Sequence, residues 1–253
     1  MTTSRGLALI TGATAGIGAE FARQLAAQGY GLVLVARDTA RLEAKAAELA
    51  AEFGVITEVL TADLQTTDGL AAVENRTARV DVTLLVNNAG YGLRPPFDEN
   101  PIEDEQAHLD LLVTVPMRLT HAALRQMLPK RSGTIINIAS VAGFTPRGTY
   151  GAAKAWVLSF SRWANLNYRS RGITITAVAP GFVHTEFHDR MKVDKRSVPS
   201  FMWLHAEQLV RIALRDVARG KGVSVPTFRY KFLVWLASWA PASIVAKGAL
   251  RGR

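Results

Sequence analysis

One glycine-rich stretch decides the fold of this 253-residue chain: Thr11-Gly12-Ala13-Thr14-Ala15-Gly16-Ile17-Gly18. It follows the apolar run Leu7–Ile10, which is typical of a buried strand, and it opens a helical pattern over Ile17–Gln28. Glycines let the backbone turn sharply and approach a ligand, and a helix N-terminus offers free N–H groups to an anion. A purely structural turn needs no ligand, but the order strand, glycines, helix favours a site for the pyrophosphate of a dinucleotide.

Strand-like apolar runs alternate with helical patterns along the rest of the chain. The predicted strands are Leu7–Ile10, Leu32–Ala36, Ile56–Leu60, Val82–Val86, Thr134–Ile138, Thr174–Val178 and Val223–Val225. The predicted helices are Ile17–Gln28, Arg41–Glu52, Gly69–Arg79, Glu103–Leu128, Tyr150–Ser170 and Glu207–Ala218. This alternation predicts an α/β fold with a single doubly wound, Rossmann-type parallel sheet of about seven strands and helices on both faces. Ligands of such sheets bind beyond the carboxyl ends of the strands.

Composition narrows the class of protein. Apolar residues make up 49% of the chain and charged residues only 20%, which excludes disorder for most of it. The absence of cysteine excludes disulfide scaffolds, thiol catalysis and cysteine-based zinc sites. The longest uncharged apolar stretch near the C-terminus is 232–246, interrupted by Pro241, and it is shorter than the about 20 residues of a spanning helix. With no secretory-signal pattern after Arg5, the expectation is a cytoplasmic protein.

The formal net charge of +9 is concentrated in one region. Residues 186–253 contain 13 Lys/Arg and 5 Asp/Glu, whereas the first 185 residues carry a net charge of only +1. Three of the five tryptophans, Trp203, Trp235 and Trp239, lie in the basic region. The sequence therefore divides into a nearly neutral part, 1–225, expected to form the nucleotide-binding and catalytic domain, and a basic, aromatic-rich helical extension of it, 226–253.

Three interpretations of the extension remain open. In the first, its helices cover the core or are buried in a homo-oligomer. In the second, they form an interfacial segment whose apolar side chains enter a membrane surface while its cations meet anionic lipid. This membrane-bound arrangement would suit a lipid or long-chain ketone as substrate. Nucleic-acid binding is the weakest of the three, because the high pI of 10.2 is accompanied by no recognition motif.

Further motifs carry a resemblance to a known family. The glycine spacing is TGxxxGxG, Asn87-Asn88-Ala89-Gly90 ends the fourth predicted strand, and Pro180-Gly181 followed by Thr185 comes after the sixth. Together with Ser140, Tyr150 and Lys154, these motifs resemble the classical short-chain dehydrogenase/reductase family over about residues 6–225. The cofactor-binding residues that the resemblance implies are Gly12, Thr14, Ala15, Gly16, Ile17, Gly18, Arg37, Asp63, Asn88, Ala89, Gly90, Tyr150, Lys154, Pro180, Val183 and Thr185.

The end of the second strand predicts which nicotinamide cofactor is used. In an NAD site an acid about 20 residues beyond the glycines holds the ribose 2′-hydroxyl, whereas an arginine accommodates a 2′-phosphate. Ala36 stands where that acid is expected and Arg37 follows it, so the sequence predicts NADP(H). Two alternatives are a merely solvated Arg37 and an inward-turned Asp38. Asp63 resembles the adenine-contacting aspartate of the family, while Asp68 is expected to cap the next helix.

The resemblance also assigns the catalytic groups. Tyr150 and Lys154 are four residues apart and project from one helix face. We expect the ammonium of Lys154 to lower the pKa of Tyr150, which ordinarily is near 10. The resemblance implies that Lys154 holds the nicotinamide ribose, that Ser140 hydrogen-bonds the substrate oxygen and that Tyr150 protonates it. The predicted activity is NADPH-dependent reduction of an apolar or lipid-like ketone, such as a 3-oxoacyl lipid, or the reverse oxidation of the secondary alcohol.

Two departures from the family pattern keep a non-catalytic NADP(H)-binding protein as the alternative. Leu112 stands where the family has an asparagine that helps hold a water in a proton relay to the lysine. Either another group holds this water, or proton exchange follows a different route. The spacing of Ser140 and Tyr150, ten residues, is also shorter than is common in the family.

One spacing is reminiscent of a metal site. His184 and His188 are four residues apart with Glu186 between them, but no third ligand is evident, and we predict no metal. The polar and basic stretch from Phe187 to Pro199, like Pro95-Pro96, is expected to be a loop, and its length and position suit a lid over the site.

Overall fold

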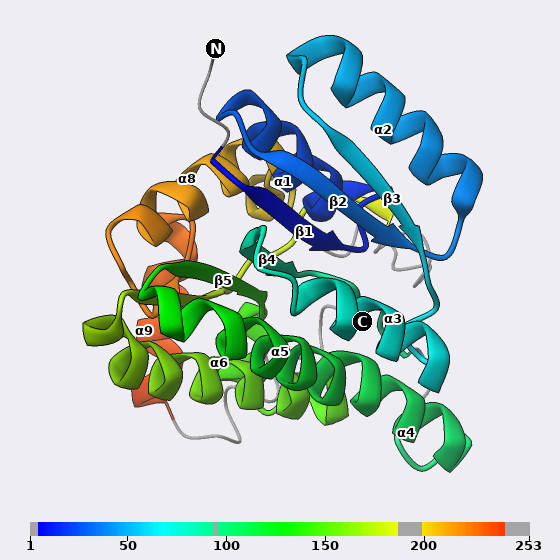
Figure 1. Cartoon of the computed structure of the whole chain (residues 1–253). Coiled ribbons are helices and arrows are strands. Elements are labelled where there is room, and N and C mark those ends of the chain that lie inside the picture. The colour runs from blue at the N-terminus through cyan, green and yellow to red at the C-terminus, as the bar shows by residue number, and fades with distance from the viewer. Residues whose placement is uncertain (1–4, 94–95, 187–198, 241–253) are drawn as a thin grey trace.

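The computed structural model describes residues 5–93, 96–186 and 199–240, and within them seven parallel strands form one sheet (Figure 1). The strands are β1 (Leu7–Thr11), β2 (Gly31–Ala36), β3 (Thr57–Thr61), β4 (Val82–Asn87), β5 (Gly133–Ile138), β6 (Ile173–Val178) and β7 (Val223–Ser224). Their order is β3-β2-β1-β4-β5-β6-β7, so the chain reverses its direction of winding between β1 and β4. The predicted doubly wound sheet is confirmed, and its reversal point is where such folds bind ligands.

Helices cover both faces of the sheet. They are α1 (Gly16–Ala27), α2 (Thr39–Phe53), α3 (Thr67–Thr77), α4 (Ile102–Leu109), α5 (Val115–Lys130), α6 (Gly148–Tyr168), α8 (Ala206–Ala218) and α9 (Phe228–Trp239). The buried side chains of α1, α2 and α8 pack on one face, and those of α3, α5 and α6 on the other. Strands buried on both faces explain why the sequence shows continuous apolar runs instead of alternation.

The predicted single helix over 103–128 is wrong in one respect. A π-helical turn, Asp110–Thr114, separates α4 from α5, and the Val115 N–H bonds to the Asp110 carbonyl five residues back. Pro116 explains the interruption, because it has no N–H to donate to the carbonyl of Leu112, its α-helical partner. The turn places Leu111 and Leu112 in buried positions beside the end of β4.

The C-terminal extension is helical over α9. Tyr230 is its buried anchor: its hydroxyl donates to the Met202 carbonyl at 2.8 Å and accepts from the Phe182 N–H at 3.0 Å. A Cβ on Gly181 would lie 1.9 Å from the Tyr230 ring, so only glycine lets the ring pack there. No helix in the described ranges is long and apolar enough to cross a membrane.

Candidate active site

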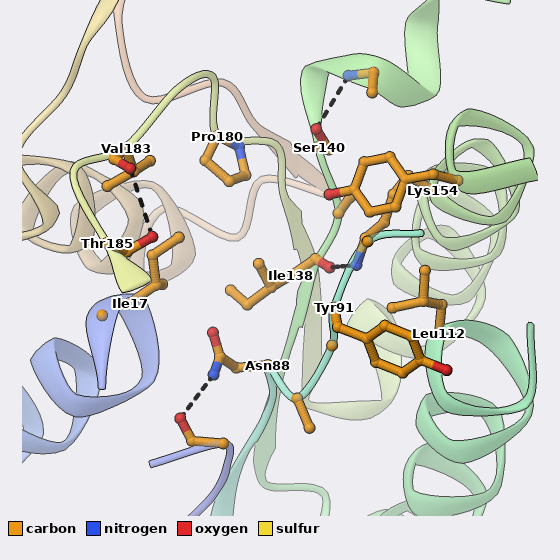
Figure 2. Close-up of a pocket in the computed structure, with 18 of the residues that line it drawn as sticks. Ile17, Asn88, Tyr91, Leu112, Ile138, Ser140, Lys154, Pro180, Val183 and Thr185 are labelled. Atoms are coloured by element: carbon orange, nitrogen blue, oxygen red, sulfur yellow. Dashed lines mark hydrogen bonds between the residues drawn. The ribbon is translucent and has the colours of Figure 1, made fainter. Parts of the chain in front are cut away.

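A cavity of about 640 Å³ opens at the carboxyl ends of the strands. Fourteen of the predicted site residues line it: Gly12, Thr14, Ala15, Gly16, Ile17, Asn88, Ala89, Gly90, Ser140, Tyr150, Lys154, Pro180, Val183 and Thr185. In Figure 2, Ile17, Val183 and Thr185 lie at one end, and Ser140 and Lys154 at the other. The other three predicted residues, Gly18, Arg37 and Asp63, belong to the described part of the chain but do not line this cavity. The fold thus brings the glycine loop and the predicted catalytic residues to one cavity.

The glycine loop needs its glycines for two reasons. Gly12 and Gly16 have positive φ angles of 67° and 57°, a conformation that side chains disfavour. A Cβ on Gly18 would lie 2.2 Å from the Gly12 carbonyl oxygen, so Gly18 allows α1 to pack against the loop. The N-cap residue of α1, Ala15, has no side chain that could accept a hydrogen bond from the first N–H groups of the helix. The first N–H groups of the helix are therefore available to an anion in the cavity.

Asn88 holds the loop in place. Its Nδ2 donates to the carbonyls of Thr11 at 2.9 Å and Gly12 at 3.1 Å. The Thr11 hydroxyl accepts in turn from the N–H groups of Asn88 and Ala89. Both hydrogens of the Asn88 amide are thus engaged within the protein, so this predicted cofactor residue acts by joining the ends of β1 and β4 (Figure 2).

Lys154 is a buried cation at the end of the cavity that Ser140 and Tyr150 line. Its Nζ donates to the Ile138 carbonyl at 2.7 Å and lies 5.7 Å from the centroid of the Tyr150 ring. Burial lowers the pKa of Lys154 from 10.5 to about 8, because the charged form loses its hydration. The ammonium is thus held by the end of β5, on the face of α6 that also carries Tyr150.

The expected lowering of the Tyr150 pKa by Lys154 is wrong for this structure. Burial raises the pKa of Tyr150, and a hydrogen bond with Ser140 and the charge of Arg147 only partly oppose the rise. The ammonium of Lys154 donates to the Ile138 carbonyl and lies over the ring of Tyr150. The Ser140 Oγ also accepts from the Ala142 N–H at 3.1 Å, which orients the serine. The phenol is therefore kept protonated and suits a proton donor.

His108 is a site residue that the sequence analysis missed. It is 1% exposed and lines the cavity, with its ring stacked 6.1 Å from that of Tyr150 at an interplanar angle of 28°. One ring nitrogen, Nε2, lies 3.1 Å from the Tyr91 carbonyl oxygen. Burial lowers the pKa of His108, which favours the neutral ring at pH 7. The signal was the spacing, since His108 lies four residues before Leu112 and on the same side of the helix.

Arg41 is the second missed residue; it does not line the cavity but contacts Thr14 and Glu186, which do. Its guanidinium donates to both carboxylate oxygens of Glu186, at 2.7 and 3.2 Å, and to the Thr14 carbonyl at 3.5 Å. Arg37 is exposed, with its Nη1 4.0 Å from Asp63 Oδ2. Asp38 accepts from the Arg41 N–H and so caps α2. Two arginines, Arg37 and Arg41, therefore follow β2, and the acid nearest to the end of this strand, Asp38, is engaged as the N-cap of α2.

The hydrogen bonds of the turn between β3 and α3 show which residue caps α3 and how Asp63 is held. The Asp63 Oδ1 accepts from the Gln65 N–H at 3.0 Å, which shapes the turn after β3. Thr66 caps α3 by accepting from the Gly69 N–H at 3.1 Å, so the prediction that Asp68 is the cap is wrong. Asp68 instead lies in the first turn, where a negative charge meets the positive end of the helix dipole.

The predicted lid and one member of the histidine pair lie largely outside the described residues, which omit 187–198 and therefore His188. His184 stacks on Trp203, with ring centroids 4.8 Å apart. Pro95 is likewise outside the described part of the chain. Thr185 packs against Gly16, and a Cβ added to Gly16 would lie 2.9 Å from the Thr185 Cγ2.

Comparisons with known proteins agree with this fold. Residues 6–196 match the protein family described as short chain dehydrogenase. The chain is 32% identical over 249 residues to a very-long-chain 3-oxoacyl-CoA reductase of Anas platyrhynchos, an alignment that covers 94% of this chain and 77% of that protein.

Two solved structures are similar as well. A short-chain dehydrogenase from Sphingobium yanoikuyae in complex with NADPH has a TM-score of 0.85 and 37% identity, covering 93% of this chain and 96% of that one. The bulky-bulky ketone specific alcohol dehydrogenase from Comamonas testosteroni has a TM-score of 0.81 and 33% identity, covering 94% and 96%.

The chain therefore belongs to the short-chain dehydrogenase family. It is an oxidoreductase of that family, which confirms the resemblance seen in the sequence and sets aside the non-catalytic alternative.

Proposed function

We propose that the protein reduces an apolar ketone with NADPH, or oxidises the matching secondary alcohol. The observation that carries this proposal is the position of Ser140, Tyr150 and Lys154 on the wall of the same cavity as the uncapped N-terminus of α1. One end of the cavity can bind a pyrophosphate and the other can protonate an oxygen. The two ends are what a hydride transfer between a nicotinamide and a carbonyl needs.

The residues present fit NADP(H). The N–H groups that begin α1 would hold the pyrophosphate, and the positive φ of Gly12 and Gly16 keeps side chains out of its way. Arg37 and Arg41 would hold the 2′-phosphate, while Asp38 is engaged as a helix cap. The related Sphingobium enzyme, whose structure contains NADPH, supports this choice. Lys154, Pro180, Val183 and Thr185 would surround the nicotinamide riboside by the family pattern.

The protein groups have separate tasks in the reaction. The reduced nicotinamide, when bound, supplies the hydride. The Tyr150 O–H gives its proton to the carbonyl oxygen, and burial keeps that proton on the phenol until it is needed. Ser140, oriented by the Ala142 N–H, donates a hydrogen bond to the same oxygen. The ammonium of Lys154 stabilises negative charge that develops on Tyr150.

The cavity wall supports an apolar substrate. Beyond the catalytic residues it is lined by Leu93, Phe97, Leu112, Val141 and Phe182. Relatives named for long-chain 3-oxoacyl-CoA and for bulky ketones agree with such a pocket. A 3-oxoacyl lipid is the specific substrate that we propose.

A chain-length series tests this function. NADPH oxidation is measured with 3-oxoacyl thioesters and simple ketones of increasing length, with Tyr150→Phe as the inactive control. We expect kcat/KM to rise with chain length, because each buried methylene adds up to about 0.8 kcal/mol of binding. A flat or falling series would remove the lipid-like substrate, and no oxidation with any ketone or alcohol would remove the proposed reaction.

We also propose that α9 contacts anionic lipid. Phe228, Phe232, Trp235 and Trp239 are exposed along one side of the helix, and Arg229 and Lys231 accompany them with no acid in α9. The opposite side is anchored by Tyr230 against Gly181, which lines the catalytic cavity. A membrane-bound α9 would thus bring the cavity close to lipid substrates.

Flotation with vesicles tests this contact. The protein should float with anionic vesicles, less so with neutral ones, and Arg229→Glu with Lys231→Glu should abolish binding. Arg79→Glu with Arg125→Glu makes the same charge change on exposed positions of other elements and should retain binding. If both pairs behave alike, only net charge matters and α9 is not the docking helix.

The predicted homo-oligomer remains a proposal. Its support is the exposure of Trp163 and Leu166 on α6, large apolar side chains that an interface would bury. Light scattering of the purified protein measures the oligomeric state, and a monomer at micromolar concentration would contradict it.

A further inference from the structure

A small cavity of about 10 Å³ adjoins the main one, with which it shares Leu112, Ile138 and Lys154 as lining residues. Lys154 and Ile138 line it together with Leu112 of the π-helical turn and Pro116 of α5. Asn87, the last residue of β4, also lines it. A volume of roughly 10–15 Å³, measured for the centre of a water-sized sphere, holds one water molecule if polar partners are present.

Asn87 supplies an acceptor of the required kind. The residue is 7% exposed, and its Oδ1 is buried without a hydrogen-bond partner among the described residues. Its Nδ2 donates to the Asn137 Oδ1 at 2.8 Å and lies 3.3 Å from the Thr120 hydroxyl. The Asn137 Nδ2 donates in turn to Ser161, which fixes the orientation of both amides. Leaving a buried acceptor unsatisfied destabilises the fold, because the carbonyl oxygen loses its hydration without a replacement, so a partner is expected.

Lys154 supplies the donor. Its ammonium carries three N–H groups, and among the described residues the Ile138 carbonyl accepts a hydrogen bond from one of them. Leu112 cannot accept a hydrogen bond through its side chain.

We propose that one buried water in the small cavity joins the Asn87 Oδ1 to the Lys154 Nζ, which makes Asn87 a positioning residue for the catalytic ammonium. The importance of Lys154 for turnover rests on the proposed function, whereas the water site itself does not. Asn87 acts from the end of β4, whereas Leu112 lies in the π-helical turn. The water keeps Lys154 charged and fixed, because it accepts a hydrogen bond from the ammonium that a dry apolar cavity could not accept.

The direct test is a high-resolution crystal structure of the unsubstituted protein. An ordered water within hydrogen-bond distance of both Asn87 Oδ1 and Lys154 Nζ is the expected result. A cavity without density, or a water that contacts only one of the two groups, overturns the proposal. This readout does not depend on activity, so it separates a failure of the water site from a failure of the proposed reaction.

Kinetics of substituted proteins test the role of Asn87. Asn87→Leu removes the acceptor and should lower kcat about tenfold or more, the loss expected for one hydrogen bond to a charged group. Because the Lys154 charge would be less stable, activity should also be lost at a lower alkaline pH. Tyr150 and His108 are the other titratable groups near Lys154, and each is unchanged in this variant. Adding Leu112→Asn to Asn87→Leu returns an amide to the cavity and should restore most of the kcat and the pH profile.

Thr120→Val is the matched control. It removes another polar contact of the Asn87 amide and leaves the Oδ1 in place. We expect a lower melting temperature with an unchanged kcat and pH profile, and NADPH binding confirms that each variant is folded. Equal losses in Thr120→Val and Asn87→Leu, or no rescue by Leu112→Asn, would show that Asn87 is only structural. If Asn87→Leu does not fold, the crystal structure decides.

Discussion

Arg41 and Glu186, which are 145 residues apart in sequence, form a two-contact ion pair that joins the start of α2 to the segment after β6. The same guanidinium reaches the carbonyl of Thr14 in the glycine loop. Both side chains are more than a third exposed, so the pair contributes at most about 1 kcal/mol to stability. Its importance is local, because it holds the Arg41 guanidinium beside Thr14 and Glu186, two residues that line the cavity.

Arg41 should determine the preference for NADPH over NADH. Arg41→Ala should weaken NADPH binding about tenfold, as the loss of a charge-assisted hydrogen bond predicts, and leave NADH binding nearly unchanged. Glu186→Gln should strengthen NADPH binding, because the carboxylate no longer competes for the guanidinium. Fluorescence titration measures both constants. Equal weakening of NADPH and NADH in Arg41→Ala would contradict this role.

Tyr150→Phe should separate chemistry from binding. Without the phenolic proton, kcat should fall at least about a hundredfold, the usual contribution of a positioned acid. NADPH affinity should stay within about twofold, because the ring still packs against His108. Stopped-flow measurement of hydride transfer checks the rate. A variant that retains most of its turnover would rule out Tyr150 as the proton donor.

Lys154→Met should stabilise the fold while it abolishes activity. Since the pKa of Lys154 is lowered from 10.5 to about 8, burial disfavours its charge by up to about 3 kcal/mol. The wild-type protein bears this penalty fully below pH 8 and loses it as the pH rises from 8 towards 10.5. Melting temperatures should therefore exceed those of the wild type most clearly at pH 7. Lys45→Met, at a surface ion pair, is the control and should show no such pH-dependent gain.

His108 should make stability sensitive to acid. Burial lowers the pKa of His108 below 6.5, so the unfolded chain takes up a proton before the native one does. Stability contributed by the neutral ring is complete above about pH 6.5 and declines as the pH falls towards the lowered pKa. His108→Phe, which can keep the stack on Tyr150, should reduce this decline. Denaturant unfolding at pH 5 and pH 7 measures it, with His121→Phe as the control.

Sequence patterns alone predicted the fold and fourteen of the residues that line the cavity. The order of strand, glycines and helix at residues 7–28, and the alternation that follows, depend on backbone geometry and periodicity within a few residues. For that reason both features could be predicted from the sequence alone. The motifs around Asn88, Ser140, Tyr150 and Pro180 end successive strands or begin the next element, and parallel strands bring their carboxyl ends to one edge.

The contacts between distant elements became visible only once the chain was folded. The stack of His108 on Tyr150, the pairing of Arg41 with Glu186 and the buried acceptor of Asn87 beside Lys154 each join segments that local patterns treat separately. The same holds for the pKa of Tyr150, which burial raises although Lys154 lies on the next turn of its helix. Burial and long-range pairing depend on how the whole sheet is covered, and no short stretch of sequence contains that information.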